Sequence, residues 1–172
     1  MGILSIKEMS GYEIKKSMEK SIGYFWQESY GQIYPTLKSL LKEGLLKSRT
    51  KIQEKGVQKI VYSITKKGEE ELDKWLEEDV EFQTYRNELL LKLFFGKKSS
   101  VSNSLHHLEK QKSKTTRTLK QYEAISSRTQ KAFAKNPNLP FWICTVQYGM
   151  EILKAELHWI ENTKKEFLKL GK

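Results

Sequence analysis

The sequence predicts a mainly α-helical protein with a small β-hairpin wing: a winged helix-turn-helix followed by an α-helical dimerisation domain. Two short amphipathic segments, the second ending in a glycine, precede two apolar-rich strand segments. Two segments of about 30 residues with helical apolar spacing fill the second half of the chain. We therefore predict two domains, residues 1–82 and 83–172.

Ser10 is expected to cap the first clear helix. Glu13 follows three residues later, which is the spacing of a capping box. The helix itself is predicted from Tyr12 or Glu13 to Gly23. Its apolar side chains recur every four residues, at Ile14, Met18 and Ile22. Residues 1–6 are predicted to hold the end of an earlier helix.

The second helix, within residues 29–44, is the predicted recognition helix. Its buried stripe consists of Ile33, Leu37, Leu40 and Leu41. Gly44 is a natural C-terminal stop. Pro35 leaves the start open, because a proline favours the first helical turn and disfavours helical geometry in the residue before it. The helix begins either at Pro35 or near Ser29 with a distorted first turn.

A β-hairpin is expected next, with strands over residues 45–52 and 57–64 and a turn supplied by Gly56. In the second strand Ile60, Tyr62 and Ile64 alternate with polar residues and are predicted to share one face. Thr65 is expected to cap the helix that follows. The apolar face of that helix is formed by Leu72, Trp75 or Leu76, and Val80.

Two long helices are predicted in the second domain, from Ser100 or Val101 to Lys135 and from Leu139 to Leu170, with a break around Pro137 and Pro140. Each is roughly 45 Å long, more than the first domain could bury. We therefore expect a second copy to cover them. The predicted dimerisation residues are Val146, Met150, Leu153, Leu157 and Ile160.

The predicted DNA-reading surface combines the recognition helix with the wing. Such a helix enters the major groove, and side chains opposite its buried stripe meet bases and phosphates. The candidate DNA contacts are Gln32, Tyr34, Thr36, Lys38, Lys42, Lys51, Lys55, Gln58 and Lys59. Arg49 adds a further cation to the wing. Tyr12 and Tyr30 are expected to project nearer the buried side of their helices and so to have structural roles.

Several of these segments resemble the PadR family of regulators. The resemblance rests on Ser10-Gly11-Tyr12-Glu13, Phe25-Trp26, the stretch from Ser29 to Leu37, Glu43-Gly44-Leu45, and the stretch from Tyr62 to Gly68. It covers residues 3–76 with order and spacing intact, and the long C-terminal region is similar to one subfamily. The resemblance implies a bacterial homodimeric repressor, often released by small aromatic or phenolic compounds. The wing departs from the family pattern, with Lys59 nearest to the usual basic position.

The composition narrows the range of functions that the protein can have. Net charge is +10, but residues 88–172 contribute +9 against +7 for residues 1–68, so charge alone does not point to the first domain. The single cysteine, Cys144, fits a reducing cytoplasm. The three histidines and Cys144 are too scattered for a zinc pattern, so no metal or cofactor is expected. No signal peptide, membrane span or catalytic motif is recognised, so we expect no membrane contact and no enzyme activity.

The sequence thus predicts a cytoplasmic transcription regulator that binds double-stranded DNA as a homodimer and represses by occupying a pseudo-palindromic operator. Four aromatic residues are candidates for an effector pocket: Trp26, Phe141, Trp142 and Trp159. Core or interface packing is the competing interpretation for each of them. The alternatives for the whole protein are a transcriptional activator and a winged-helix protein-interaction module.

Overall fold

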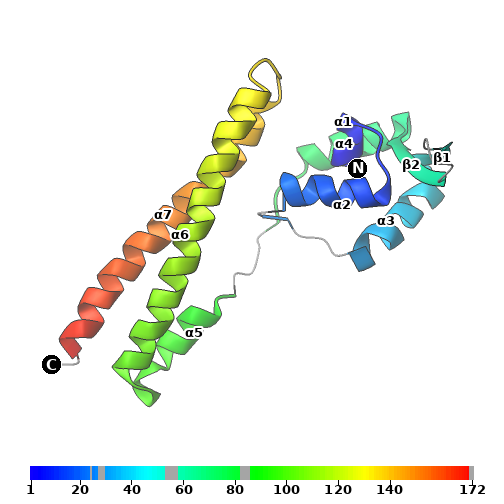
Figure 1. The fold of residues 1–172 in the computed structure, drawn as a ribbon. Helices are drawn as coiled ribbons and strands as arrows, with labels where there is room; N and C mark the ends of the chain where they lie inside the picture. The colour runs from blue at the N-terminus through cyan, green and yellow to red at the C-terminus, as the bar shows by residue number, and fades with distance from the viewer. Residues whose placement is uncertain (24, 27–29, 53–57, 82–85, 171–172) are drawn as a thin grey trace. The chain divides into compact units, whose positions relative to one another are not determined.

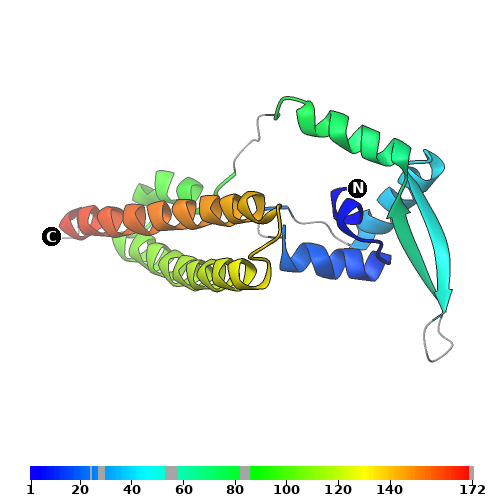
Figure 2. The same cartoon turned by 90° about the horizontal axis from the view of Figure 1, so that it is seen from above.

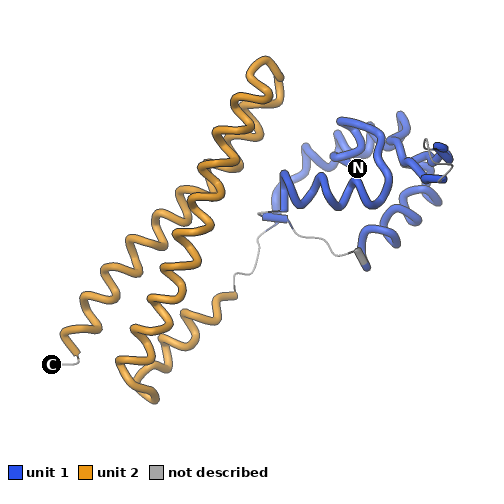
Figure 3. The backbone as a smooth tube through the Cα atoms, in the orientation of Figure 1, with its two compact units in different colours: residues 1–82 blue, residues 83–172 orange. Residues whose placement is uncertain are grey.

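The computed structural model describes residues 1–23, 25–26, 30–52, 58–81 and 86–170. The chain divides into two compact units, residues 1–82 and 83–172 (Figure 3). The first contains α1 (Gly2–Ile6), α2 (Gly11–Lys20), α3 (Tyr30–Lys42), β1 (Leu46–Ile52), β2 (Gln58–Ile64) and α4 (Lys66–Glu77). The second contains α5 (Glu88–Phe94), the 3₁₀ turn η1 (Gly96–Lys98), α6 (Val101–Ala132) and α7 (Leu139–Leu170).

In the first unit, α1, α2 and α3 pack beside the hairpin of β1 and β2 (Figure 1). The strands pair antiparallel, from Leu46 opposite Ile64 to Ile52 opposite Gln58. An isolated bridge joins Met9 to Tyr62, so a third chain segment borders β2. One apolar cluster holds these elements together: Leu4, Ile14, Ile33, Leu37, Leu46 and Tyr62. The predicted winged helix-turn-helix is the observed fold.

The hairpin is buried only at its base. Tyr62 and its neighbour Val61 are both buried, whereas Ile52 and Ile60 are exposed. The prediction of one apolar face along the whole second strand is therefore too simple. The outer half of the hairpin extends beyond the helices, so alternation in the sequence does not produce burial there.

α3 runs unbroken from Tyr30 to Lys42 with Pro35 inside it, which favours the longer of the two predicted helices. Proline removes one backbone donor, and the carbonyl that loses its partner belongs to Gly31. Both residues are exposed, so water can satisfy that carbonyl. Burial of Ile33 and Leu37 on the opposite side holds the helix against the core.

The end of α3 is a Schellman motif. Gly44 has a φ of 72°, and its N–H donates to the Leu41 carbonyl at 3.1 Å, while the Leu45 N–H donates to the Leu40 carbonyl at 2.9 Å. The predicted stop at Gly44 is confirmed. α2, by contrast, ends at Lys20 rather than Gly23, because Ser21 leaves helical geometry with a φ of −122°, and the N–H groups of Ser21 and Gly23 both donate to the Met18 carbonyl, at 3.1 and 2.7 Å.

α4 begins directly against the turn that follows α3. Thr65 caps it as predicted, accepting from the Gly68 N–H at 3.1 Å, and the Thr65 hydroxyl lies 2.8 Å from the Gly44 carbonyl oxygen. Gly68 is buried, and a Cβ at this position would lie 2.2 Å from the Leu45 carbonyl oxygen. The spacing of Thr65 and Gly68 therefore reflects a close contact between two backbone segments.

The second half of α4 is less covered than its apolar pattern suggested. Leu72 is half-buried, but Trp75 and Leu76 are both exposed in the single chain. Val80 lies beyond the end of the helix, which stops at Glu77. Of the predicted apolar face, only Leu72 is partly covered within the first unit, and the other side chains stay exposed in the single chain.

In the second unit, α6 and α7 form an antiparallel helical hairpin and lie side by side along their lengths (Figures 1 and 2). α5 packs beside the start of α6. The seam buries Leu108 and Tyr122 from α6 and Ile143 and Ile160 from α7. Gly149 makes room for the Tyr122 ring, since a Cβ there would lie 2.1 Å from Tyr122 Cε2.

This packing removes one residue from the predicted dimer seam. Ile160 has 0% of its surface exposed in the single chain, so it packs against α6 and has no surface left for a second copy. The other four predicted residues, Val146, Met150, Leu153 and Leu157, share its side of α7 and are half-buried. Their role in a dimer stays a prediction.

Polar groups fix the register of the helical hairpin. The Thr115 hydroxyl donates to Glu156 Oε2 at 2.7 Å, and the Gln111 amide donates to Glu156 Oε1 at 3.0 Å. Towards the end of α7, Lys112 pairs with Glu161 at 2.7 Å, and Lys164 pairs with Glu109. Sliding one helix along the other would separate all of these partners.

Gly68→Ala should lower the free energy of unfolding by about 1–3 kcal/mol, although alanine is the better helix former. The added methyl group meets the Leu45 carbonyl oxygen, which the backbone holds in place. Urea denaturation followed by circular dichroism measures the change. Gly2→Ala in α1 is the control, because nothing described lies within 4 Å of a Cβ there. Equal stability of the two variants would contradict the prediction.

Candidate nucleic-acid interface

α3 presents a polar face away from the core. Ile33 and Leu37 are buried, and the residues between and around them are exposed. The five predicted contacts on this helix are all exposed: Gln32, Tyr34, Thr36, Lys38 and Lys42. A face of this size, with amide, hydroxyl and ammonium donors, is chemically suited to base edges and phosphates. Their contact with DNA stays a prediction.

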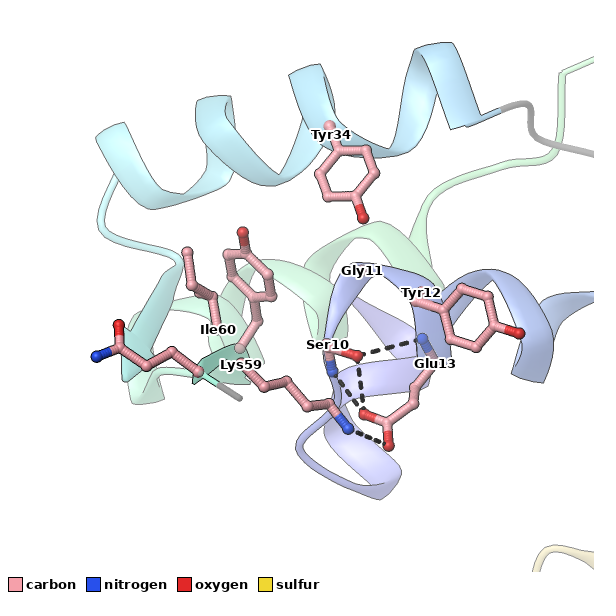
Figure 4. Close-up of a pocket in the computed structure, with 9 residues that line it drawn as sticks. Ser10, Gly11, Tyr12, Glu13, Tyr34, Lys59 and Ile60 are labelled. Atoms are coloured by element: carbon pink, nitrogen blue, oxygen red, sulfur yellow. Dashed lines mark hydrogen bonds and ion pairs between the residues drawn. The ribbon is translucent and has the colours of Figure 1, made fainter. Parts of the chain in front are cut away.

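Tyr34 also has a structural role. It is 51% exposed, yet its ring lies over Gly11 at the start of α2 (Figure 4). A Cβ at Gly11 would lie 2.8 Å from Tyr34 Cε1, so only glycine allows this approach. Gly11 therefore lets the Tyr34 ring of α3 pack closely against the start of α2.

The start of α2 carries the predicted capping box. Ser10 is buried; its Oγ accepts from the Glu13 N–H at 3.3 Å, and its N–H donates to Glu13 Oε2 at 2.9 Å. The other carboxylate oxygen, Glu13 Oε1, lies 2.5 Å from Lys59 Nζ on β2. The same carboxylate thus caps a helix and binds a strand of the wing.

These contacts determine the charge of Glu13. The hydrogen bond from Lys59, followed by the Ser10 backbone N–H, lowers the pKa of Glu13 to about 2, and partial burial opposes the shift. Glu13 is therefore ionised at neutral pH, and Lys59 has a fixed counter-charge.

A second ion pair ties the other wing strand to the same region. Arg49 on β1 donates to Glu8 Oε1 at 2.5 Å, and this hydrogen bond lowers the pKa of Glu8. Between the two ion pairs, Met9 and Tyr62 exchange backbone hydrogen bonds of 3.1 and 2.9 Å. The wing is held to the segment before α2 through both of its strands.

The other predicted wing residues are less uniform. Lys51 and Gln58 are exposed, and Lys55 lies outside the described residues. Lys59 differs from these two: its side chain is 24% exposed and pairs with Glu13, and its contact with DNA stays a prediction.

Tyr12 was placed wrongly by the sequence, which suggested the buried side of its helix. It is 57% exposed. It lines a groove between α2, α3 and β2 together with Ser10, Gly11, Glu13, Tyr34, Gln58, Lys59, Ile60 and Tyr62 (Figure 4). Its spacing from Ile14 already carried the signal, because residues two apart point to nearly opposite sides of a helix.

The candidate effector residues do not converge within the second unit. Phe141 is exposed, and Trp142 is half-buried with its ring edge-on to Phe133 at a centroid distance of 5.4 Å. Trp159 is half-buried roughly 25 Å further along α7, by the rise of a helix. Trp26, which is exposed, belongs to the first unit. α7 by itself therefore cannot bring Trp142 and Trp159 to one pocket.

Among the described residues, no group of histidine, cysteine, aspartate and glutamate side chains could hold a metal ion. No described helix is long and apolar enough to cross a membrane.

Comparison with known families gives two matches. Residues 1–74 match the transcriptional regulator PadR-like family, and residues 85–167 match the family described as virulence activator alpha C-term. The chain is 28% identical over 167 residues to the negative transcriptional regulator PadR of Bacillus subtilis (strain 168), across 94% of this chain and 91% of that protein.

Solved structures are similar over nearly the whole chain. Bacillus subtilis PadR in complex with operator DNA has a TM-score of 0.87 at 27% identity, covering 96% of this chain and 93% of that one. The same protein in complex with p-coumaric acid has a TM-score of 0.78 at 26% identity, covering 96% and 94%. The Vibrio cholerae virulence activator AphA, at 24% identity over 98% and 95% and a TM-score of 0.76, shares the fold.

Stability should respond to acid through Glu13. A carboxyl whose pKa falls on folding stabilises the folded state above its unfolded pKa, and that stability is lost as the pH drops from about 4.5 towards about 2. Wild type should therefore exceed Glu13→Gln in unfolding free energy at pH 7, and the difference should shrink by pH 3. Urea denaturation at both pH values measures it. Glu70→Gln, exposed on α4, controls for loss of one negative charge. A difference that does not change with pH would refute the assignment.

Proposed function

Because residues 1–74 belong to the PadR-like family of transcriptional regulators, we propose that this protein is a cytoplasmic homodimeric repressor that binds a pseudo-palindromic operator. The observation that carries the proposal is the exposed polar face of α3, backed by a buried apolar face and flanked by an anchored wing. Two such helices on a dimer would enter successive major grooves about 34 Å apart. Occupancy of the promoter would then block transcription.

The exposed side chains of α3 are suited to two kinds of DNA contact, to base edges and to phosphates. Gln32 is suited to a base edge, since its amide can both donate to and accept from adenine. Thr36 and Tyr34 are exposed as well, and the Tyr34 hydroxyl lies towards Gly11 at the start of α2. Lys38 and Lys42 supply charge for phosphates, as does Lys51 on the wing. The uncharged side chains would give sequence preference, and the three lysines would give affinity.

A small aromatic acid is the effector we propose. Support comes from the solved complex of Bacillus subtilis PadR with p-coumaric acid. The effector would favour a dimer whose two recognition helices no longer match the operator spacing. The protein therefore acts by binding and not by catalysis. p-Coumaric acid is the first compound to add to the DNA-binding assay described below.

Activation is the second candidate function. It is favoured by one observation, the match of residues 85–167 to the family described as virulence activator alpha C-term. An activator would bind the same kind of DNA site but leave the promoter open and contact the polymerase. In vitro transcription from a bound promoter separates the two, since a repressor lowers and an activator raises the transcript.

For the dimer, we propose the outer face of α7, defined by Phe141, Tyr148 and Ile152. These side chains are 70%, 70% and 53% exposed and recur at helical spacing on the side away from α6. Residues 139–150 contain no charged side chain. Uncharged, aromatic-rich surface is typical of interface cores, and each buried aromatic ring contributes roughly 150–250 Å².

DNA recognition is tested by fluorescence anisotropy on a labelled duplex from upstream of the protein's own gene and on an unrelated duplex. Lys38→Ala should weaken binding to both and reduce the slope of log affinity against log salt by about 0.9. Gln32→Ala should weaken binding to the specific duplex by about 1–3 kcal/mol and leave the unrelated duplex unaffected. Lys120→Ala, exposed on α6, is the charge control. Equal losses from Lys120→Ala and Lys38→Ala would contradict the assignment of the α3 face.

The dimer face is tested by sedimentation velocity. Ile152→Asp should convert the dimer to monomer, because it places a charge in an apolar interface. Gln147→Asp, exposed on α7 but away from the outer face, should remain dimeric. If Leu153→Ala dissociates the protein while Ile152→Asp does not, the inner face is the interface and the proposal is wrong.

A further inference from the structure

Three elements of the first unit meet at the start of α2. Tyr34 of α3 lies over Gly11, the next residue after the Ser10 cap. The cap fixes the Glu13 carboxylate, and that carboxylate binds Lys59 of β2 (Figure 4). An unbroken series of contacts therefore runs from the recognition helix to the wing.

We propose that Glu13 and Lys59 are a positioning pair that fixes the wing relative to α3 for DNA binding, and that Lys59 does not contact a DNA phosphate. The inference rests on the proposed function, because it concerns how a DNA-binding surface is held. It also reverses the expectation that Lys59 belongs with the phosphate-binding lysines.

The geometry of the carboxylate favours this role. Glu13 Oε2 accepts from the Ser10 N–H at 2.9 Å and from the Ser10 hydroxyl at 3.0 Å, while Oε1 lies 2.5 Å from Lys59 Nζ. The Glu13 side chain is 46% exposed, but the two hydrogen bonds from the buried Ser10 hold its carboxylate at the start of α2. Moving Lys59 to DNA would leave Oε1 without this partner.

Comparison with the ion pair between Arg49 and Glu8 also favours a positioning role for Lys59. The Arg49 side chain is 63% exposed beside Glu8, whereas the Lys59 side chain is 24% exposed beside Glu13. Arg49 has five donors and can bind Glu8 and a phosphate together. Lys59 is more enclosed and its partner is held by two further hydrogen bonds, so its charge is committed to the fold.

Salt dependence distinguishes the two roles of a lysine. A lysine that neutralises a phosphate releases counterions from the DNA, and its removal lowers the slope of log affinity against log salt by about 0.9. A lysine that only positions the wing changes affinity through the other contacts and leaves that slope unaltered. A variant that only loses folding stability would not lower the slope of log affinity against log salt.

The test uses the full-length protein and the two duplexes described above, with anisotropy measured at several salt concentrations. Glu13→Gln keeps the capping box, since glutamine also serves at this position, and removes the ion pair. Lys59→Gln removes the same pair from the other side. The double variant completes a cycle, and Lys59→Arg keeps the pair. Circular dichroism melts confirm that each variant is folded at the assay temperature.

Each single variant should weaken DNA binding about two- to fivefold, close to the upper end of what a partly exposed ion pair contributes. The double variant should be no weaker than either single one, Lys59→Arg should bind like wild type, and all salt slopes should equal that of wild type. Tighter binding by Glu13→Gln, or a lower slope for Lys59→Gln, would show that Lys59 contacts phosphate and overturn the proposal. Additive losses would also overturn it.

Failure of the proposed function gives a different result. If wild type shows no salt-sensitive binding to either duplex, the repressor assignment fails and the positioning role fails with it. If wild type binds and Lys38→Ala lowers the slope, the proposed function stands whatever the Glu13 and Lys59 cycle shows. The two hypotheses are therefore judged by separate measurements.

Discussion

The hydrogen bonds around Ser10 are the constraint on which the first unit depends. Ser10 is buried, caps α2 and orients the Glu13 carboxylate. The residue before it, Met9, pairs with Tyr62 through the backbone, and the residue after it, Gly11, accepts the ring of Tyr34. Within residues 9–13 the chain pairs with a strand, caps α2 and meets the ring of Tyr34 on α3. The polar contacts of this short segment act together with the apolar core to hold the exposed face of α3 beside the wing.

Local signals in the sequence predicted most of the elements. A capping box, a glycine stop and a threonine cap each depend on residues within a few positions, so Ser10, Gly44 and Thr65 could be identified without the fold. The start of α3 could not, because Pro35 argues locally for a late start and only the burial of Ile33 and its neighbours favours the long helix. Tertiary packing decided against the local preference.

Part of the candidate site could also be predicted from the sequence. The exposed face of α3 follows from periodicity, since four apolar residues define the opposite side. The partners of Lys59 and Arg49 do not, because Glu13 and Glu8 lie on other elements and ion pairs distant in sequence leave no periodic signal. In α7, periodicity located an apolar seam correctly but could not say which helix covers it. Ile160 shows that the neighbour is α6 of the same chain.

The Tyr122 ring against Gly149 has a consequence for how this protein can change over evolutionary time. The close approach and the polar contacts of Glu156 constrain the inner face of α7, while the outer face is free of both requirements. Substitutions can therefore accumulate on the outer face without loss of the helical hairpin. If the outer face carries the dimer contact that we propose for it, two paralogues produced by a gene duplication could stop forming mixed dimers through a few such substitutions, and each would keep an intact helical hairpin.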